Sequence, residues 1–144
     1  MNEFVSTLTF ENYLVTELTY KQNRNYDFDS DVLNVDFDIS AKVQLTTEKD
    51  SAVTIQVVCG NEEDSDCPFI IKVEVIGIFK FEGELDKFEK LVTTNAIAIL
   101  FPYVRSLISD LSGKSNVYPQ YNLPLINVVK FIKNNDKLEI IKPE

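Results

Sequence analysis

Apolar and polar side chains alternate along three consecutive segments of the chain. From Val35 to Leu45 every second residue is apolar, and the residues between are Asp, Ser, Lys or Gln. Similar alternation follows from Val53 to Cys59 and from about Pro68 to Glu82. A period of two with one polar face is typical of strands in an antiparallel sheet. Tyr13 to Lys21 alternates less cleanly and predicts one more strand ahead of these three.

Two of the predicted strands carry apolar residues on both faces. On the first, Leu14, Leu18 and Tyr20 fall on one face, opposite Val15, Glu17, Thr19 and Lys21. On the fourth, the polar face also contains Ile70, Ile76 and Ile78. An apolar patch on an outer face indicates an interface.

Beyond Glu84 the apolar spacing changes to that of a helix. We expect a long helix over 85–112, with a kink or restart near Pro102 and Gly113 as its C-cap. The segment 117–124 contains two prolines and is predicted to be extended, and a short helix is predicted over 125–134. Leu138, Ile140 and Ile141 are compatible with a final extended piece. The predicted fold class is therefore α+β, a four-stranded antiparallel sheet with a long and a short helix packed on one face.

The chain has 144 residues, which predicts a single domain, with its core at about 13–133 and loosely held ends that include residues 1 to about 10. Its net charge is −9, so we expect neither nucleic acid nor an anionic membrane as a partner. Met1 is not followed by the features of a signal peptide, and the longest apolar run, 96–104, is too short to insert into a membrane. We expect a cytoplasmic protein.

Most catalytic chemistry has no residues to support it. There is no histidine, and the four glycines do not form a phosphate-binding loop, so we expect neither an enzyme nor a bound cofactor. Asp27, Asp29 and Asp31 resemble the start of a calcium loop, but Val32 occupies the position that requires glycine, so no metal site is predicted. Cys59 and Cys67 flank an acidic loop; two reduced thiols are the favoured interpretation, and pairing stays open.

Two features indicate binding instead. The stretch around Leu100-Phe101-Pro102-Tyr103 is apolar nearly all round, and a single sheet covers only one side of a helix. Its other side is expected to meet a second subunit or a ligand. The predicted loops also carry unusual aromatic and apolar residues: Tyr26 and Phe28 in one, and Tyr118, Tyr121 and Leu123 in the other. Tyr26 and Phe28 either fold back onto the core or line a binding surface.

Two motifs resemble the SecB export chaperone family. One is Ile99-Leu-Phe-Pro-Tyr-Val-Arg105 and the other is Tyr118-Pro-Gln-Tyr-Asn-Leu-Pro124, and the order of four strands, a long helix and a short helix is similar over about 13–133. The resemblance implies a homotetramer, a dimer of dimers, with helices at the interface. It places that interface at the following residues of the long helix: Leu100, Tyr103, Val104, Leu107, Ile108 and Leu111.

The resemblance also implies a holdase that binds unfolded polypeptides without ATP. Clients would lie in an apolar groove between the segments 22–31 and 114–126. The residues expected to line that groove are Tyr26, Phe28, Tyr118, Tyr121 and Leu123.

The resemblance is weakest at the surface where the family's translocation motor docks. Of the four residues expected there, Glu17 and Glu74 are acidic, whereas Lys21 and Lys72 stand where acidic residues are expected. Coupling to the motor is therefore a weak expectation. Two alternatives remain open: a dedicated adaptor for one client, such as an antitoxin, and a carrier of a small apolar ligand.

Overall fold

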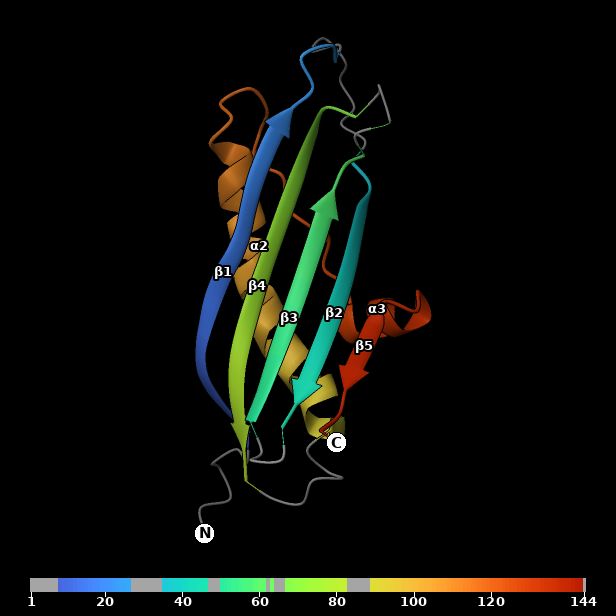
Figure 1. Cartoon of the computed structure of the whole chain (residues 1–144). Coiled ribbons are helices and arrows are strands. Elements are labelled where there is room, and N and C mark those ends of the chain that lie inside the picture. The colour runs from blue at the N-terminus through green and yellow to red at the C-terminus, as the bar shows by residue number, and fades with distance from the viewer. Residues whose placement is uncertain are drawn as a thin grey trace.

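Five strands and two stretches of helix make up the described part of the chain (Figure 1). The computed structural model describes residues 8–26, 35–46, 50–61, 63, 67–82 and 89–143. The elements are β1 (Leu8–Gln22), β2 (Phe37–Leu45), β3 (Asp50–Cys59), β4 (Phe69–Phe81), the π-helical turn η1 (Val92–Ala96), α2 (Ile97–Gly113), α3 (Val128–Asn134) and β5 (Leu138–Ile141).

The strands form one sheet in the order β1-β4-β3-β2-β5. All neighbours are antiparallel except β2 and β5, which are parallel. The α+β class is confirmed, but the prediction of four strands is wrong by one. The fifth strand has only four residues, too few for alternation to show in the sequence. Its position also contradicts the expectation of a loosely held end, since Ala41 N donates to Lys137 O at 3.0 Å.

The middle strands follow the predicted alternation. On β3 and β4 every second residue is buried, and the buried face lies against α2. Figure 1 shows α2 running obliquely across one face of the sheet, with α3 beside it near β2 and β5. Leu100, Val104 and Ile108 of α2 have no exposed surface and pack within the core that α2 and the sheet share. The core is thus built from one sheet face and one side of the long helix.

The first strand departs from the prediction in its length and its faces. β1 begins at Leu8, so residues 8–10 belong to the sheet. The register with β4 shifts between Phe10 and Asn12 and again between Val15 and Glu17. Because an extra residue in one strand moves later side chains to the other face, simple alternation fails there. Val15 is opposite the inward Val75 and shares the helix side of the sheet with Leu18, whereas Leu14 is opposite Ile76 on the outer side.

The long helix is continuous through Pro102. The helical residues run from Glu89 to Gly113, and the irregular turn lies earlier, at η1. Pro102 and Ala98 are both exposed, so the carbonyl of Ala98 that loses its helical hydrogen bond lies on the exposed side. Gly113 is the last helical residue and not the C-cap, because Lys114 caps the helix with φ −68° and the left-handed turn comes at Asn116.

This 25-residue helix is long and apolar enough to cross a bilayer by length and composition alone. Core helices of soluble proteins have the same property, and here the helix packs on the sheet. The finding is therefore weak evidence for membrane insertion.

Candidate functional site

Five aromatic rings from three parts of the chain gather at one end of the sheet. Tyr118 lies 6.2 Å from Tyr26 and 5.8 Å from Phe69, measured between ring centroids. Phe69 is also 5.9 Å from Tyr121 and 5.7 Å from Tyr20. These spacings are those of aromatic pairs in contact. We call the five residues the aromatic cluster.

The backbone around Tyr26 is attached to the start of β4. Asn23 N donates to Pro68 O at 2.9 Å, and Asn23 Nδ2 donates to Cys67 O at 2.8 Å. Tyr26 N in turn donates to Asn23 O. The turn after β1 is therefore hydrogen-bonded to the start of the strand that carries Phe69, which brings Tyr26 into the cluster.

The segment between α2 and α3 is attached along the long helix. Tyr121 N donates to Ser112 Oγ at 2.8 Å, and Arg105 Nη2 donates to Leu123 O at 3.0 Å. Ser109 and Asn122 are joined at 2.7 Å between their side-chain oxygens. These bonds align residues 117–127 with α2 although the segment has no regular secondary structure, and they hold Tyr118 and Tyr121 over the end of the sheet.

Three of the five predicted groove residues meet in this cluster: Tyr26, Tyr118 and Tyr121. Leu123 is only 2% exposed, so it belongs to the core and does not line a surface. Phe28 lies outside the described residues. The sequence did not indicate Tyr20 or Phe69 as site residues, because a strand aromatic has the same pattern whether it meets the core or a loop.

Two tyrosines of the cluster, Tyr118 and Tyr121, have raised pKa values. Burial and, to a smaller extent, the nearby Cys59 and Asp36 raise the pKa of Tyr121 to about 12. Burial also raises the pKa of Tyr118, followed by smaller effects of Tyr20 and Tyr26. Since these phenols stay protonated, the cluster presents rings and hydroxyls rather than charge.

The two thiols lie beneath the cluster. Cys59 and Cys67 are both buried and free. Cys67 Sγ donates to Phe69 O at 3.0 Å, and a Cβ added at Gly60 would be 2.8 Å from that sulfur. Burial, and secondarily Cys67, raises the pKa of Cys59 from 9.0 to about 12. Cys59 is therefore a protonated core thiol at neutral pH.

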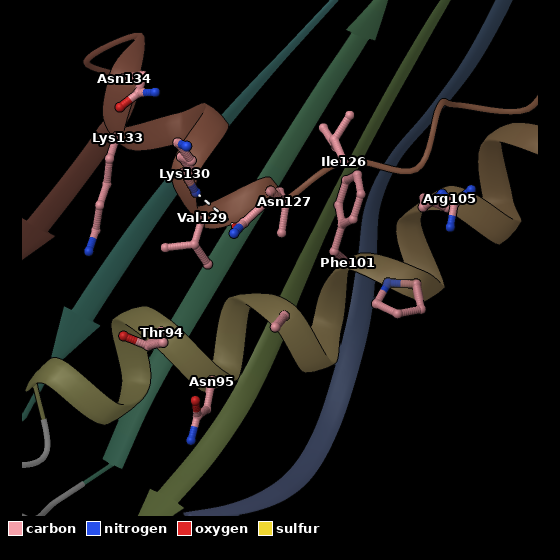
Figure 2. Close-up of a pocket in the computed structure, with 13 residues that line it drawn as sticks. Thr94, Asn95, Phe101, Arg105, Ile126, Asn127, Val129, Lys130, Lys133 and Asn134 are labelled. Carbon is pink, nitrogen blue, oxygen red and sulfur yellow. Dashed lines mark hydrogen bonds between the residues drawn. The ribbon is translucent and has the colours of Figure 1, made fainter.

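A cavity of about 680 Å³ lies between α2 and α3, further along the same connecting segment. We call it the α2–α3 cavity. Figure 2 shows Phe101 and Ile126 facing one another, with Arg105 beyond them and Lys133 and Val129 projecting from α3 toward the long helix. The complete lining is Thr94, Asn95, Ala98, Phe101, Pro102, Arg105, Ile126, Asn127, Val128, Val129, Lys130, Lys133 and Asn134.

No separate signal in the sequence indicates this cavity. Phe101 and Pro102 lie within the motif that was interpreted as an oligomer interface, and Ile126 was assigned to a helix. Whether Phe101 and Pro102 come close to Ile126 depends on where α3 turns back over α2. No local pattern in the sequence specifies that position. A second hollow, of about 800 Å³, lies on the other side of the aromatic cluster, between Tyr20–Asn25 and Asn61, and has a more polar lining.

Apolar residues are also exposed between β1 and the adjoining side of α2. We call Tyr13, Val15, Leu18 and Tyr103 the β1–α2 strip. Tyr13 and Tyr103 are 4.8 Å apart between ring centroids, and Tyr103 is 40% exposed. Figure 1 shows β1 at the open edge of the sheet, with α2 behind it.

The predicted interface residues divide into two groups in this structure. Leu100, Val104 and Ile108 are fully buried within the chain's own core, so they have no surface left for a second subunit. Tyr103 is exposed, and Leu107 and Leu111 are half-buried. Only these three of the six are available on the free surface.

The predicted motor-docking residues lie on the sheet face away from α2. Glu17 is opposite Glu74, and Lys72 is opposite Thr19 in the next row. Lys21 is opposite Ile70 near the end of β1. The two carboxylates and two ammonium groups share one outer face, which therefore carries mixed charge.

Within the described ranges, no group of three or more His, Cys, Asp or Glu side chains is arranged to hold a metal ion. Asp27, Asp29 and Asp31, the residues that resemble a calcium loop, lie outside those ranges.

Comparisons with known proteins agree with this architecture. The chain is 32% identical over 135 residues to "Uncharacterized protein MJ0357" of Methanocaldococcus jannaschii, covering 92% of this chain and 86% of that protein. It is 25% identical to the protein-export protein SecB of a Ruegeria species, covering 93% of this chain and 79% of that one.

A solved structure has a similar fold. It is that of the Mycobacterium tuberculosis Rv1957 SecB-like chaperone in complex with a ChAD peptide from the HigA1 antitoxin. It matches with a TM-score of 0.66 at 16% identity, covering 83% of this chain and 91% of that one. The model of the family described as preprotein translocase subunit SecB matches residues 3–137. The chain therefore belongs to the SecB family.

Proposed function

We propose that this protein is an ATP-independent holdase of the cytoplasm, which binds unfolded polypeptides and performs no catalysis. The observation that supports this most directly is the aromatic cluster, in which two loops distant in sequence present neutral rings at the end of the sheet. Tyrosines bury large areas with little loss of side-chain entropy, so they suit clients of varied sequence.

The segment that carries Tyr118 and Tyr121 has more apolar surface to offer. Leu125 is 86% exposed, and Val117 is also exposed. An extended chain lying along residues 117–127 would meet these side chains between the aromatic cluster and the α2–α3 cavity. The relatives named SecB are protein-export proteins, and the M. tuberculosis structure holds a peptide, which agrees with a polypeptide client here.

We further propose that the protein is a homo-oligomer, a dimer of dimers, in which the β1–α2 strip is covered by a second copy. β1 is an edge strand whose helix side is apolar and exposed, and exposed edges of this kind invite pairing. Leu107 and Leu111 extend that surface along α2, beyond Tyr103. The same surface explains how a helix with apolar residues on several sides is accommodated in solution.

The holdase proposal is tested with a chemically unfolded model client. Stoichiometric protein is expected to suppress the client's aggregation in the absence of nucleotide, as measured by light scattering. Tyr26→Ser with Tyr118→Ser is expected to remove most of this suppression. Tyr26→Phe with Tyr118→Phe is the matched control, because it keeps both rings and should keep the activity. If the wild type has no effect on aggregation, the proposal is wrong.

A second candidate is a dedicated adaptor for one client, such as an antitoxin. Lys21 and Lys72 favour it, because they give the outer sheet face a mixed charge rather than a uniformly acidic surface for a translocation motor. Affinity capture from the native host is expected to recover one dominant partner under this second candidate. Recovery of a broad set of unfolded clients would favour the general holdase.

A further inference from the structure

The α2–α3 cavity has a charge opposite to that of the whole protein. Its lining contains Arg105, Lys130 and Lys133, and none of its thirteen residues is Asp or Glu. The chain as a whole carries a net charge of −9. Because ionic screening at physiological salt acts over about 8 Å, the charges of the lining residues act on a bound ligand more strongly than distant acidic side chains do.

These three cations have no acidic partner within the described residues. The ion pairs there join other lysines to Glu11, Asp110, Asp38 and Glu89. Arg105 uses Nη2 for the carbonyl of Leu123, while its Nε is buried without a hydrogen-bond partner. A buried donor without an acceptor has a desolvation cost that a bound acceptor would relieve.

Apolar surface lies between the positive groups. Phe101 and Ile126 face one another in Figure 2, with Arg105 on one side of them and Lys133 on the other. Pro102 and Val129 complete the apolar part of the lining. The volume is in the range of sites that hold small ligands or short peptide stretches, not folded domains.

We infer that the α2–α3 cavity binds client segments in which one or two apolar side chains adjoin Asp or Glu. This inference rests on the proposed holdase function and adds a sequence preference to it. The apolar side chains pack against the wall formed by Phe101 and Ile126, and a carboxylate meets Arg105 or the lysines of α3. The partner is a polypeptide rather than a free carboxylic acid, because the connecting segment that forms one wall also carries Tyr118 and Tyr121.

Three fluorescent peptides of equal length test the preference. Each has the same two Leu and one Phe, flanked by Glu, by Gln or by Lys. Fluorescence anisotropy with the full-length protein is expected to give the Glu peptide a Kd about tenfold lower than that of the Gln peptide, equivalent to about 1.4 kcal/mol. The Lys peptide is expected to bind most weakly.

Two double variants locate the effect. Lys130→Gln with Lys133→Gln is expected to make the Glu and Gln peptides bind alike, with the Gln peptide unchanged. Lys42→Gln with Lys90→Gln removes equal charge from exposed sites outside this cavity and is expected to keep the preference. Equal affinity for the Glu and Gln peptides in the wild type, or a preference that survives in the first variant, would overturn the inference.

Two further measurements separate this inference from the holdase proposal. An unfolded model client should be held by the wild type and by both double variants, and failure of all three would contradict the holdase itself. Decanoate serves as a free carboxylate of similar chemistry. If decanoate displaces the Glu peptide at equal molar concentration, the cavity recognises a small amphipathic acid and the polypeptide assignment is wrong.

Discussion

Gly77 allows the long helix to approach the sheet closely. A Cβ added there would lie 2.9 Å from Phe79 Cε1 and 3.0 Å from Leu100 Cδ1. Gly77→Ala is therefore expected to destabilise the protein by about 1–3 kcal/mol, the usual cost of overpacking a core. Urea unfolding followed by circular dichroism measures the change.

Gly113 is the matched control for that substitution. A Cβ added there would be 3.9 Å from Gln120, which is ordinary contact, and the residue is helical. Gly113→Ala is expected to stabilise the protein by about 0.5–1 kcal/mol, because alanine is the better helix former. If both substitutions destabilise the protein, the close packing of the helix near Gly77 is not the cause of the effect of Gly77→Ala.

Cys59 makes stability depend on pH at the alkaline end. Because burial raises the pKa of this thiol from 9.0 to about 12, folding favours its protonated form. Its contribution is fully present below about pH 9 and is lost as the pH rises toward 12. Cys59→Ala is expected to lose less free energy of unfolding between pH 8 and pH 11 than the wild type, as measured by urea unfolding. Tyr121 titrates in the same direction in both proteins, so parallel losses would contradict the assignment to Cys59.

At single residues, a sequence pattern is informative where the neighbours that matter are local. Aromatic residues in polar loops, such as Tyr26, indicated a surface because nothing in a loop's own pattern needs them. Leu123 is buried instead of lining a groove, and its backbone carbonyl accepts from Arg105, 18 positions earlier in the chain. Contacts of that range leave no trace in a local pattern.

Among the elements, β1 provides the sharpest prediction about assembly. Its two register shifts place Val15 and Leu18 on the helix side and Leu14 on the outer side. Val15→Lys with Leu18→Lys is expected to dissociate the oligomer, because two ammonium groups would have to be buried in the β1–α2 strip. Light scattering coupled to gel filtration measures the molar mass.

Leu14→Lys is the corresponding control, since this side chain is equally exposed but faces the other way. It is expected to leave the molar mass unchanged. Dissociation by Leu14→Lys to the same extent would show that the interface does not lie on the helix side of β1.

Regular elements could be predicted where the pattern is long and uninterrupted. β2, β3 and β4 each maintain their alternation over nine residues or more, and all three were found. β1 was found with the faces of Leu14 and Val15 exchanged, because an inserted residue reverses alternation without changing composition. β5 was missed as a strand of the sheet, since four residues are too few to show alternation and its partner, β2, lies much earlier in the chain.

For the whole molecule, the net charge predicts how clients arrive. A protein of net charge −9 attracts basic unfolded chains over long distances at low ionic strength. Raising the salt concentration is expected to slow capture of a basic unfolded client by on the order of tenfold, as seen by stopped-flow fluorescence. Capture of a client of zero net charge should change little, and an equal slowing of both would contradict electrostatic steering.

The α+β fold class was predictable at this scale, but the α2–α3 cavity was not. Strand and helix periods determine which layers form, and the order of the elements determines which face the helices cover. The cavity instead depends on the angle at which α3 returns over Phe101 and Ile126, a property of three-dimensional packing.

The parallel pairing of β5 with β2 also determines when the sheet is completed. Ala41 of β2 is opposite Leu138, so a ribosome adds the partner of that edge long after β2 itself. About 100 residues separate the two, which takes roughly 5 to 20 s at ordinary elongation rates. Throughout that interval β2 has an unpaired edge in the nascent chain. A member of a chaperone family is itself, during synthesis, a chain with an exposed strand that other chains can pair with.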